Sequence, residues 1–183
     1  MDKIKLVVFD MAGTTVKDER EVETCFYNAA KKSGLKTTRE RIRELQGYPK
    51  KEVIRTLWKE AAGEDNPDLD QAVETTNHLF QAIIENHYRL NPVKPAEGAV
   101  DTFKWLRAEG VKIALTTGFY RKVADILLNR LGWDEGLDEN YVGDETSLID
   151  LSLTPDEVGA GRPDPDMIFK AMDILGVDDP KHV

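Results

Sequence analysis

The hydrophobic positions along the chain change their spacing twice, and these changes divide the sequence into three stretches. Residues 4–9 form an apolar run, rich in β-branched and aromatic side chains, that stops at Asp10 and predicts a buried strand. In residues 18–92 the apolar side chains recur at helical spacing. Beyond residue 93, helical patterns alternate with an apolar run that is typical of a strand. The order indicates an α/β core that a helical block interrupts after the first strand.

The helical block predicts four amphipathic helices. Gly34, the turn at 47–49 and Asn66-Pro67 separate them, and residues 91–95 have the composition of an exit linker. We expect residues 17–92 to form an all-helical cap domain inserted between residues 1–16 and 93–183 of the core. The predicted apolar faces contain Val22, Phe26, Ala29 and Ala30; Ile42 and Leu45; Val53, Ile54 and Leu57; and Val73, Leu79, Phe80, Ile83 and Ile84.

The last stretch predicts βαβ units and therefore a parallel sheet. The expected elements are a helix, a strand, and two further helices, at residues 99–108, 111–116, 120–131 and 165–175. Strands that alternate with helices of this length are typical of a Rossmann-like fold. In such folds the substrate binds at the carboxyl ends of the strands, where Asp10 and Thr117 lie. The cap is placed in the sequence to act as a lid over that edge.

The composition narrows the classes of partner. A net charge of −9 and a pI of about 4.9 argue against a broad basic surface for nucleic acid or an anionic membrane. The single cysteine, Cys25, cannot form an internal disulfide, which fits a reducing cytoplasm. No stretch approaches the ~20 apolar residues of a membrane span. We therefore expect a cytoplasmic protein, and a phosphorylated ligand would need positive charge that is concentrated locally.

The segment VVFDMAGTT carries the strongest functional signal. A lone Asp after an apolar strand most often caps a turn. Here Asp10 is followed by a small residue two positions later and then by Gly13, Thr14 and Thr15, which resembles the first motif of the haloacid dehalogenase (HAD) superfamily. The resemblance implies a HAD fold in which Asp10 is the nucleophile. Its carboxylate is ionised at neutral pH and needs no base to activate it.

Two later segments resemble the second and third HAD motifs. IALTTG ends a predicted strand in hydroxyl residues and a glycine, and the resemblance implies that Thr117 and Gly118 bind phosphoryl oxygens. The helix that begins near Tyr120 would add its positive end to that site. GAGRPDPDMIF places Arg162 before a Pro-x-Pro helix start. In the family this cation pairs with the nucleophile and neutralises the transition state.

The fourth HAD motif, a strand followed by metal-binding carboxylates, has no match in this sequence. Val142-Gly143-Asp144 with Asp150 resembles it loosely, but it precedes Arg162 and its two carboxylates are too widely spaced, so we reject it. The sequence ends where the fourth motif should begin, which predicts a core that is truncated at its C-terminus. The resemblance implies Mg²⁺ as cofactor, held in the familiar roles by the Asp10 carboxylate and the Ala12 carbonyl.

Ala12 points to one branch of the superfamily. Most HAD phosphatases carry an Asp at this position, which protonates the leaving group and then activates water. An alanine cannot give this general acid–base help, which is worth ~10²–10⁴-fold. The pattern Asp-x-Ala-Gly-Thr-Thr is similar to the phosphonatase-like branch, whose members cleave a carbon–phosphorus bond.

In that branch a cap lysine forms a Schiff base with the substrate aldehyde and acts as an electron sink. Gly47-Tyr48-Pro49-Lys50 matches the Gly-x-x-Lys of the family, which makes Lys50 the candidate and Lys51 a weaker rival. Two departures stand against it, because Val53 replaces a family histidine and Pro49 alters the turn. The residues that the resemblance implies as substrate contacts are Met11, Ala12, Thr14, Gly118 and Gly47.

The sequence thus predicts a Mg²⁺-dependent hydrolase of a small phosphonate or phosphate, acting through an aspartyl-phosphate. A HAD phosphate monoester phosphatase, a non-catalytic HAD scaffold that binds a phosphorylated ligand, and a dehalogenase-type enzyme stay as alternatives. The substrate and the oligomeric state, a homodimer included, stay open.

Overall fold

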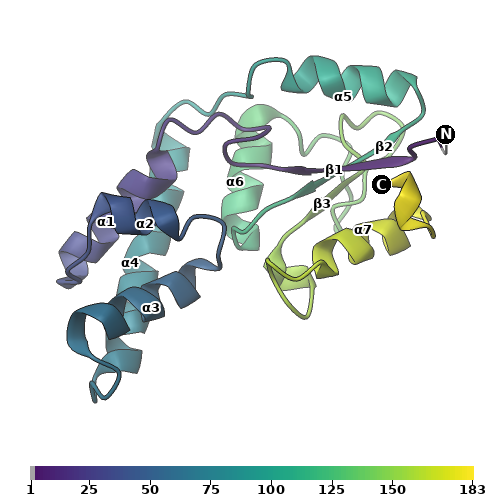
Figure 1. Ribbon diagram of the computed structural model, residues 1–183. Coiled ribbons are helices and arrows are strands. Elements are labelled where there is room, and N and C mark those ends of the chain that lie inside the picture. The colour runs from purple at the N-terminus through teal and green to yellow at the C-terminus, as the bar shows by residue number, and fades with distance from the viewer. Residues whose placement is uncertain (1–2) are drawn as a thin grey trace. The chain divides into compact units, whose positions relative to one another are not determined.

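The computed structural model describes residues 3–183 and divides the chain into two compact units (Figure 1). One unit comprises the chain up to Lys17 and again from Pro92 to Val183. The other comprises Asp18–Asn91. We describe each unit by itself and call them the core unit and the cap unit.

A three-stranded parallel sheet forms the centre of the core unit. The strands are β1 (Leu6–Asp10), β2 (Lys112–Thr116) and β3 (Leu151–Leu153), in the order β1-β2-β3. This confirms the predicted parallel sheet and α/β class. The register pairs Asp10 with Thr116 and Thr116 with Leu153, so all three strands end at one edge. The fold therefore brings the last residues of the first two strands side by side.

Helices cover both faces of this sheet. On one face the buried Leu6, Ala114 and Leu151 pack against α7 (Asp166–Leu175). On the other face Phe9 packs edge-on against Phe103 of α5 (Ala99–Ala108), with ring centroids 5.4 Å apart. Successive strand residues point to opposite faces, which is why Leu6 and Phe9 serve different layers. Helix α6 (Arg121–Leu131) and the short 3-10 helices η1 (Pro155–Glu157) and η2 (Pro180–His182) complete the unit.

The cap unit consists of four helices, α1 (Glu21–Ser33), α2 (Arg39–Glu44), α3 (Lys50–Ala62) and α4 (Leu69–Leu90). Helix α4 packs against both α1 and α3. Phe26 and Phe80 meet between α1 and α4 at 5.4 Å, and Trp58 donates to the buried Thr76 hydroxyl at 2.9 Å between α3 and α4. Within residues 3–183, no helix has the length and apolar character that crossing a bilayer requires.

One buried carboxylate ties α1 to α2. The Glu23 side chain is 2% exposed and pairs with Arg39 at 3.1 Å and Arg43 at 3.0 Å. Burial opposes ionisation, but hydrogen bonds from the two guanidinium groups outweigh it and hold the pKa of Glu23 below its ordinary value.

Glu23→Gln is expected to lower the free energy of unfolding by about 1–2 kcal/mol at pH 7, because a buried charge-assisted pair is lost. The folded-state pKa lies below the ordinary value of 4.5, so the contribution is complete above that value and is lost as the pH falls through the folded pKa. Urea unfolding at pH 7 and pH 3 should show the difference shrinking in acid. Glu64→Gln, at the exposed 3.4 Å pair with Lys59, is the matched control and should change little. A difference that is equal at both pH values would contradict this assignment.

Candidate active site

A tight turn holds Asp10 at the tip of β1. The Met11 carbonyl accepts the amides of Thr14, Thr15 and Val16 at 3.1, 2.9 and 2.8 Å. The Thr15 hydroxyl donates to the Asp10 carbonyl at 2.9 Å. Gly13 has a φ of +85°, a conformation that glycine adopts at little cost. The Gly-Thr-Thr sequence therefore fixes the backbone that carries the carboxylate.

Arg162 joins the ends of β1 and β2. One guanidinium nitrogen, Nη1, forms an ion pair with Asp10 Oδ1, and Nη2 donates to Thr116 Oγ1 at 2.7 Å. The Thr116 hydroxyl donates in turn to the Phe9 carbonyl at 3.3 Å. The Asp10 and Arg162 side chains are 32% and 31% exposed, so solvent or a ligand reaches both. The result is a carboxylate and a guanidinium in contact at the carboxyl ends of the strands. The Thr116 hydroxyl binds the other terminal nitrogen of the guanidinium.

Thr117, the threonine that the sequence favours, has a different hydrogen-bond partner. Its side chain is buried, and its hydroxyl accepts the Phe119 amide at 3.2 Å. A hydroxyl that accepts one hydrogen bond still has its own proton to donate. The hydroxyl that contacts Arg162 belongs to Thr116, which the sequence motif does not predict as a site residue. Which of the two adjacent threonines reaches Arg162 depends on how β2 is paired with β1. The sequence alone does not predict that register.

The other core-unit residues that are predicted to contact the substrate differ in how exposed they are. Met11 is 0% exposed as a whole residue, backbone included, so this structure gives a substrate no access to it. Thr14 is exposed, and Ala12 and Gly118 are half-buried. The first amide of α6, that of Arg121, donates to Asp156 Oδ2 at 2.8 Å. The Arg121 amide is therefore already bound to a carboxylate, which leaves it less available to bind a phosphate.

Asp144 and Asp150 have structural partners instead of a shared metal site. Asp144 Oδ1 accepts from Thr146 and Ser147 within its own turn, with the Thr146 amide at 2.8 Å. Asp150 is buried, accepts the Ile113 amide at 2.8 Å and pairs with Lys112 at 3.1 Å. In the described part of the chain, no three His, Cys, Asp or Glu side chains gather in a metal-binding group. Asp10 supplies a carboxylate that is 32% exposed, which suits a Mg²⁺ ion that keeps several waters and takes further oxygens from a substrate.

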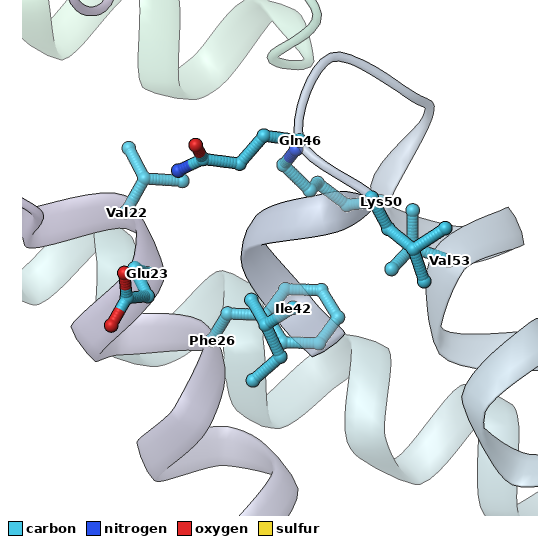
Figure 2. Close-up of a pocket in the computed structure, with 8 residues that line it drawn as sticks. Val22, Glu23, Phe26, Ile42, Gln46, Lys50 and Val53 are labelled. Atoms are coloured by element: carbon cyan, nitrogen blue, oxygen red, sulfur yellow. The ribbon is translucent and has the colours of Figure 1, made fainter. Parts of the chain in front are cut away.

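Lys50 and Gly47 belong to the cap unit. Gly47 has a φ of +95° in the turn before α3, and Lys50 is the first residue of that helix. The Lys50 amine donates to the Tyr48 carbonyl at 3.4 Å. Lys50 and Gln46 line a small pocket whose other walls are apolar apart from Glu23 (Figure 2). Its volume of about 10 Å³ is room for about one water molecule.

Val53, at the position of the family histidine, also lines this pocket. Val53 is buried, with 3% of the residue exposed. A valine brings no proton donor or acceptor to the pocket, so an imine at Lys50 would lack the help that a histidine could give. The amine of the rival candidate, Lys51, forms a 2.5 Å ion pair with Glu74.

The chain is similar to known hydrolases over its length. The model of the haloacid dehalogenase-like hydrolase family matches residues 4–183. Phosphonoacetaldehyde hydrolase of Bacteroides fragilis is 32% identical over 193 residues, which cover 100% of this chain and 68% of that protein.

Two solved structures share the fold. A predicted phosphoglycolate phosphatase of Haemophilus somnus 129pt matches with a TM-score of 0.73 and 19% identity, over 100% of this chain and 76% of its own. A phosphonoacetaldehyde hydrolase-like protein of Oleispira antarctica matches with a TM-score of 0.70 and 22% identity, over 97% and 62%. These identities are low, so the two structures support the fold alone. The family match, the identity to the Bacteroides enzyme and the parallel sheet together show that the chain belongs to the haloacid dehalogenase-like hydrolases.

Proposed function

We propose that this hydrolase cleaves a small phosphonate that carries an aldehyde, by transferring its phosphoryl group to Asp10. The observation that carries the proposal is the contact of Arg162 with Asp10. A carboxylate nucleophile and a phosphoryl group repel each other, and a shared guanidinium offsets that repulsion as charge develops. Phosphonoacetaldehyde is the substrate class that the name of the Bacteroides relative suggests.

In the first half-reaction an Asp10 oxygen attacks phosphorus and the phosphorus–carbon bond breaks. Lys50 is proposed to condense first with the substrate aldehyde, releasing water and forming an imine. The electron pair of the broken bond then enters the imine and gives an enamine, so no free carbanion forms. Protonation and hydrolysis of the enamine return the aldehyde product and the Lys50 amine.

In the second half-reaction water attacks the phosphorus of the aspartyl-phosphate, which releases inorganic phosphate and restores Asp10. Thr117, through its hydroxyl proton, and the Gly118 amide are proposed to bind phosphoryl oxygens. Ala12 has no group that protonates an alkoxide, which disfavours phosphate monoesters with poor leaving groups. Monoesters with good leaving groups, cleaved without Lys50, are the second candidate function.

A Mg²⁺ ion would be held by the Asp10 carboxylate and the Ala12 carbonyl. When bound, it would neutralise charge on the phosphoryl oxygens. We propose a cytoplasmic enzyme with a small metabolite as its partner. Measurement of the mass in solution would show whether the protein forms a homodimer.

Borohydride trapping tests the role of Lys50. Phosphonoacetaldehyde with Mg²⁺ and borohydride should attach the reduced carbon chain to Lys50, since reduction converts an imine to a stable amine. Lys50→Arg should abolish labelling. Lys51→Arg, one residue along the same helix, is the matched control and should be labelled normally. Peptide mass spectrometry gives the readout.

Two results would separate the candidate functions. Release of aldehyde and phosphate without a Lys50 adduct would contradict the Schiff-base step. Turnover of p-nitrophenyl phosphate together with no turnover of phosphonoacetaldehyde would favour the phosphatase.

The two threonines should respond differently to replacement by valine. Thr116→Val removes one hydrogen bond to Arg162 and should lower kcat about 10-fold with little change in KM. Thr117→Val removes a proposed ligand of the bound phosphoryl group and should raise KM by a similar factor. Steady-state kinetics of each valine variant beside the corresponding serine variant checks this, because serine keeps the hydroxyl. Identical effects on kcat and KM at both positions would contradict the distinction.

A further inference from the structure

We propose that Arg121 is a positioning residue that holds the loop of Arg162 against the end of β2 and so places the guanidinium of Arg162 on Asp10. Arg121 is the first residue of α6 and follows the Thr116-Thr117-Gly118 turn closely. It lies outside the three segments of this sequence that resemble HAD motifs, at residues 7–15, 113–118 and 159–169. The inference rests on the proposed function of Asp10 and Arg162.

The Arg121 guanidinium is bound on nearly every side. Nε and Nη2 donate to the two carboxylate oxygens of Glu157 at 2.9 and 2.8 Å, in a bidentate arrangement. Nη1 and Nη2 also reach the hydroxyl and carbonyl of Ser152 in β3 at 3.2 and 3.0 Å. The side chain is 14% exposed. A bidentate pair of this kind restricts orientation as well as distance.

An aromatic ring covers the remaining face. The Tyr141 ring centroid lies 3.7 Å from Arg121 Cζ, within cation–π range. Tyr141 has a φ of +61°, which is uncommon for a bulky residue and is retained only where the surroundings require it. Its hydroxyl donates to Asp125 Oδ2 at 3.2 Å. The backbone is therefore strained at Tyr141, the residue whose ring lies over the Arg121 guanidinium.

Glu157 connects the Arg121 side chain to the segment that leads to Arg162. Its Oε2 accepts the amide and the hydroxyl of Thr154 at 2.6 and 2.9 Å, which closes a capping box around η1. Burial favours the neutral acid, but hydrogen bonds from Arg121 and Thr154 keep the pKa of Glu157 below its ordinary value. Asp156 adds a second link, through the Arg121 amide. The 3-10 helix η1 is therefore fastened to the first turn of α6 from two of its residues.

The loop of Arg162 folds back on η1. A Cβ built at Gly161 would be in van der Waals contact with the Pro155 ring, at 3.4 Å from its Cβ, so the backbone next to Arg162 lies close to the first residue of η1. At the other end of the loop, the Ala160 amide donates to Asp166 Oδ2 at 3.0 Å. A shift of η1 would consequently move Arg162. A misplacement of about 1 Å at a charged catalytic group can lower the rate about 10²-fold.

Arg121→Lys tests the proposal, because lysine keeps the charge and loses the bidentate fork. Whichever of phosphonoacetaldehyde and p-nitrophenyl phosphate the wild-type protein hydrolyses serves as substrate. We expect kcat to fall about 10- to 100-fold while KM changes less than about 3-fold. Glu157→Gln should lower kcat by the same factor. The double variant should lose no more kcat than either single variant, because both substitutions break the same Arg121–Glu157 interaction.

Arg41→Lys is the matched control. Arg41 forms a similar fork with Glu60 in the cap unit, with nitrogen–oxygen distances of 3.1 and 2.5 Å, and does not line the pocket of Lys50. It should keep kcat within about 2-fold. Circular dichroism establishes that each variant is folded at the assay temperature.

Three results would overturn the inference: a wild-type kcat in Arg121→Lys, losses that add in the double variant, or an equal loss in Arg41→Lys. A wild-type protein that turns over neither substrate would contradict the proposed function itself, which is a separate outcome.

Discussion

Asp10→Asn is expected to abolish hydrolysis of phosphonoacetaldehyde in the presence of Mg²⁺, with a loss on the order of 10⁴-fold or more. Asparagine has nearly the size of aspartate and keeps one oxygen, but its amide is neutral and does not attack phosphorus. Measurement of aldehyde and phosphate release under steady-state conditions gives the result.

The same variant should stay folded and bind inorganic phosphate more tightly than the wild type. The Asp10–Arg162 pair is about one-third exposed, so its loss changes stability little. Removing a negative charge beside a bound phosphate removes a repulsion and leaves Arg162 free to pair with the ligand. Titration calorimetry with phosphate provides this control. Retained turnover would refute the nucleophile, whereas loss of both turnover and phosphate binding would point to a damaged fold.

Arg162→Lys is expected to lower kcat about 10²- to 10³-fold, the range found when one preorganised donor to a developing charge is removed. The Arg162 guanidinium contacts Asp10 with one nitrogen and Thr116 with another, and lysine lacks the rigid fork of two nitrogens that makes both contacts at once. Because the charge is kept, substrate binding should weaken less than kcat falls.

Arg107→Lys in the same unit is the matched control. Arg107 pairs with Asp150 at 3.4 Å and donates to the Glu145 carbonyl at 3.2 Å, so it also binds a carboxylate and an oxygen, but away from Asp10. Its kcat should stay near the wild-type value. An Arg162→Lys enzyme with normal kcat would contradict the charge-neutralising role.

The long, periodic elements of this fold are predictable from the sequence. The helix at 99–108 has the bounds of α5, and the helices expected at 120–131 and 165–175 each begin one residue earlier than α6 and α7. Their apolar faces recur over three turns, which is a strong signal. Strand β3 was not predicted, because Leu151–Leu153 is too short to show a period.

The site is predictable only in part. The positions of Asp10 and Arg162 follow from local motifs, and the ion pair between them joins residues 152 positions apart. The contact of Arg162 with Thr116 depends on strand register, which a motif does not contain. The Arg121 network depends on β3 and η1 lying beside the start of α6. No local pattern marks that arrangement, since its parts come from four separate segments.

Mass spectrometry of acid-quenched enzyme tests the nucleophile most directly. Wild-type protein mixed with Mg²⁺ and excess phosphonoacetaldehyde, then stopped in acid during turnover, should contain one added phosphoryl group on the peptide that carries Asp10. The modification should disappear as substrate is exhausted and be absent from Asp10→Asn. Turnover without any phosphoryl group on that peptide, or with the group on another residue, would contradict attack on phosphorus by the carboxylate at the end of β1.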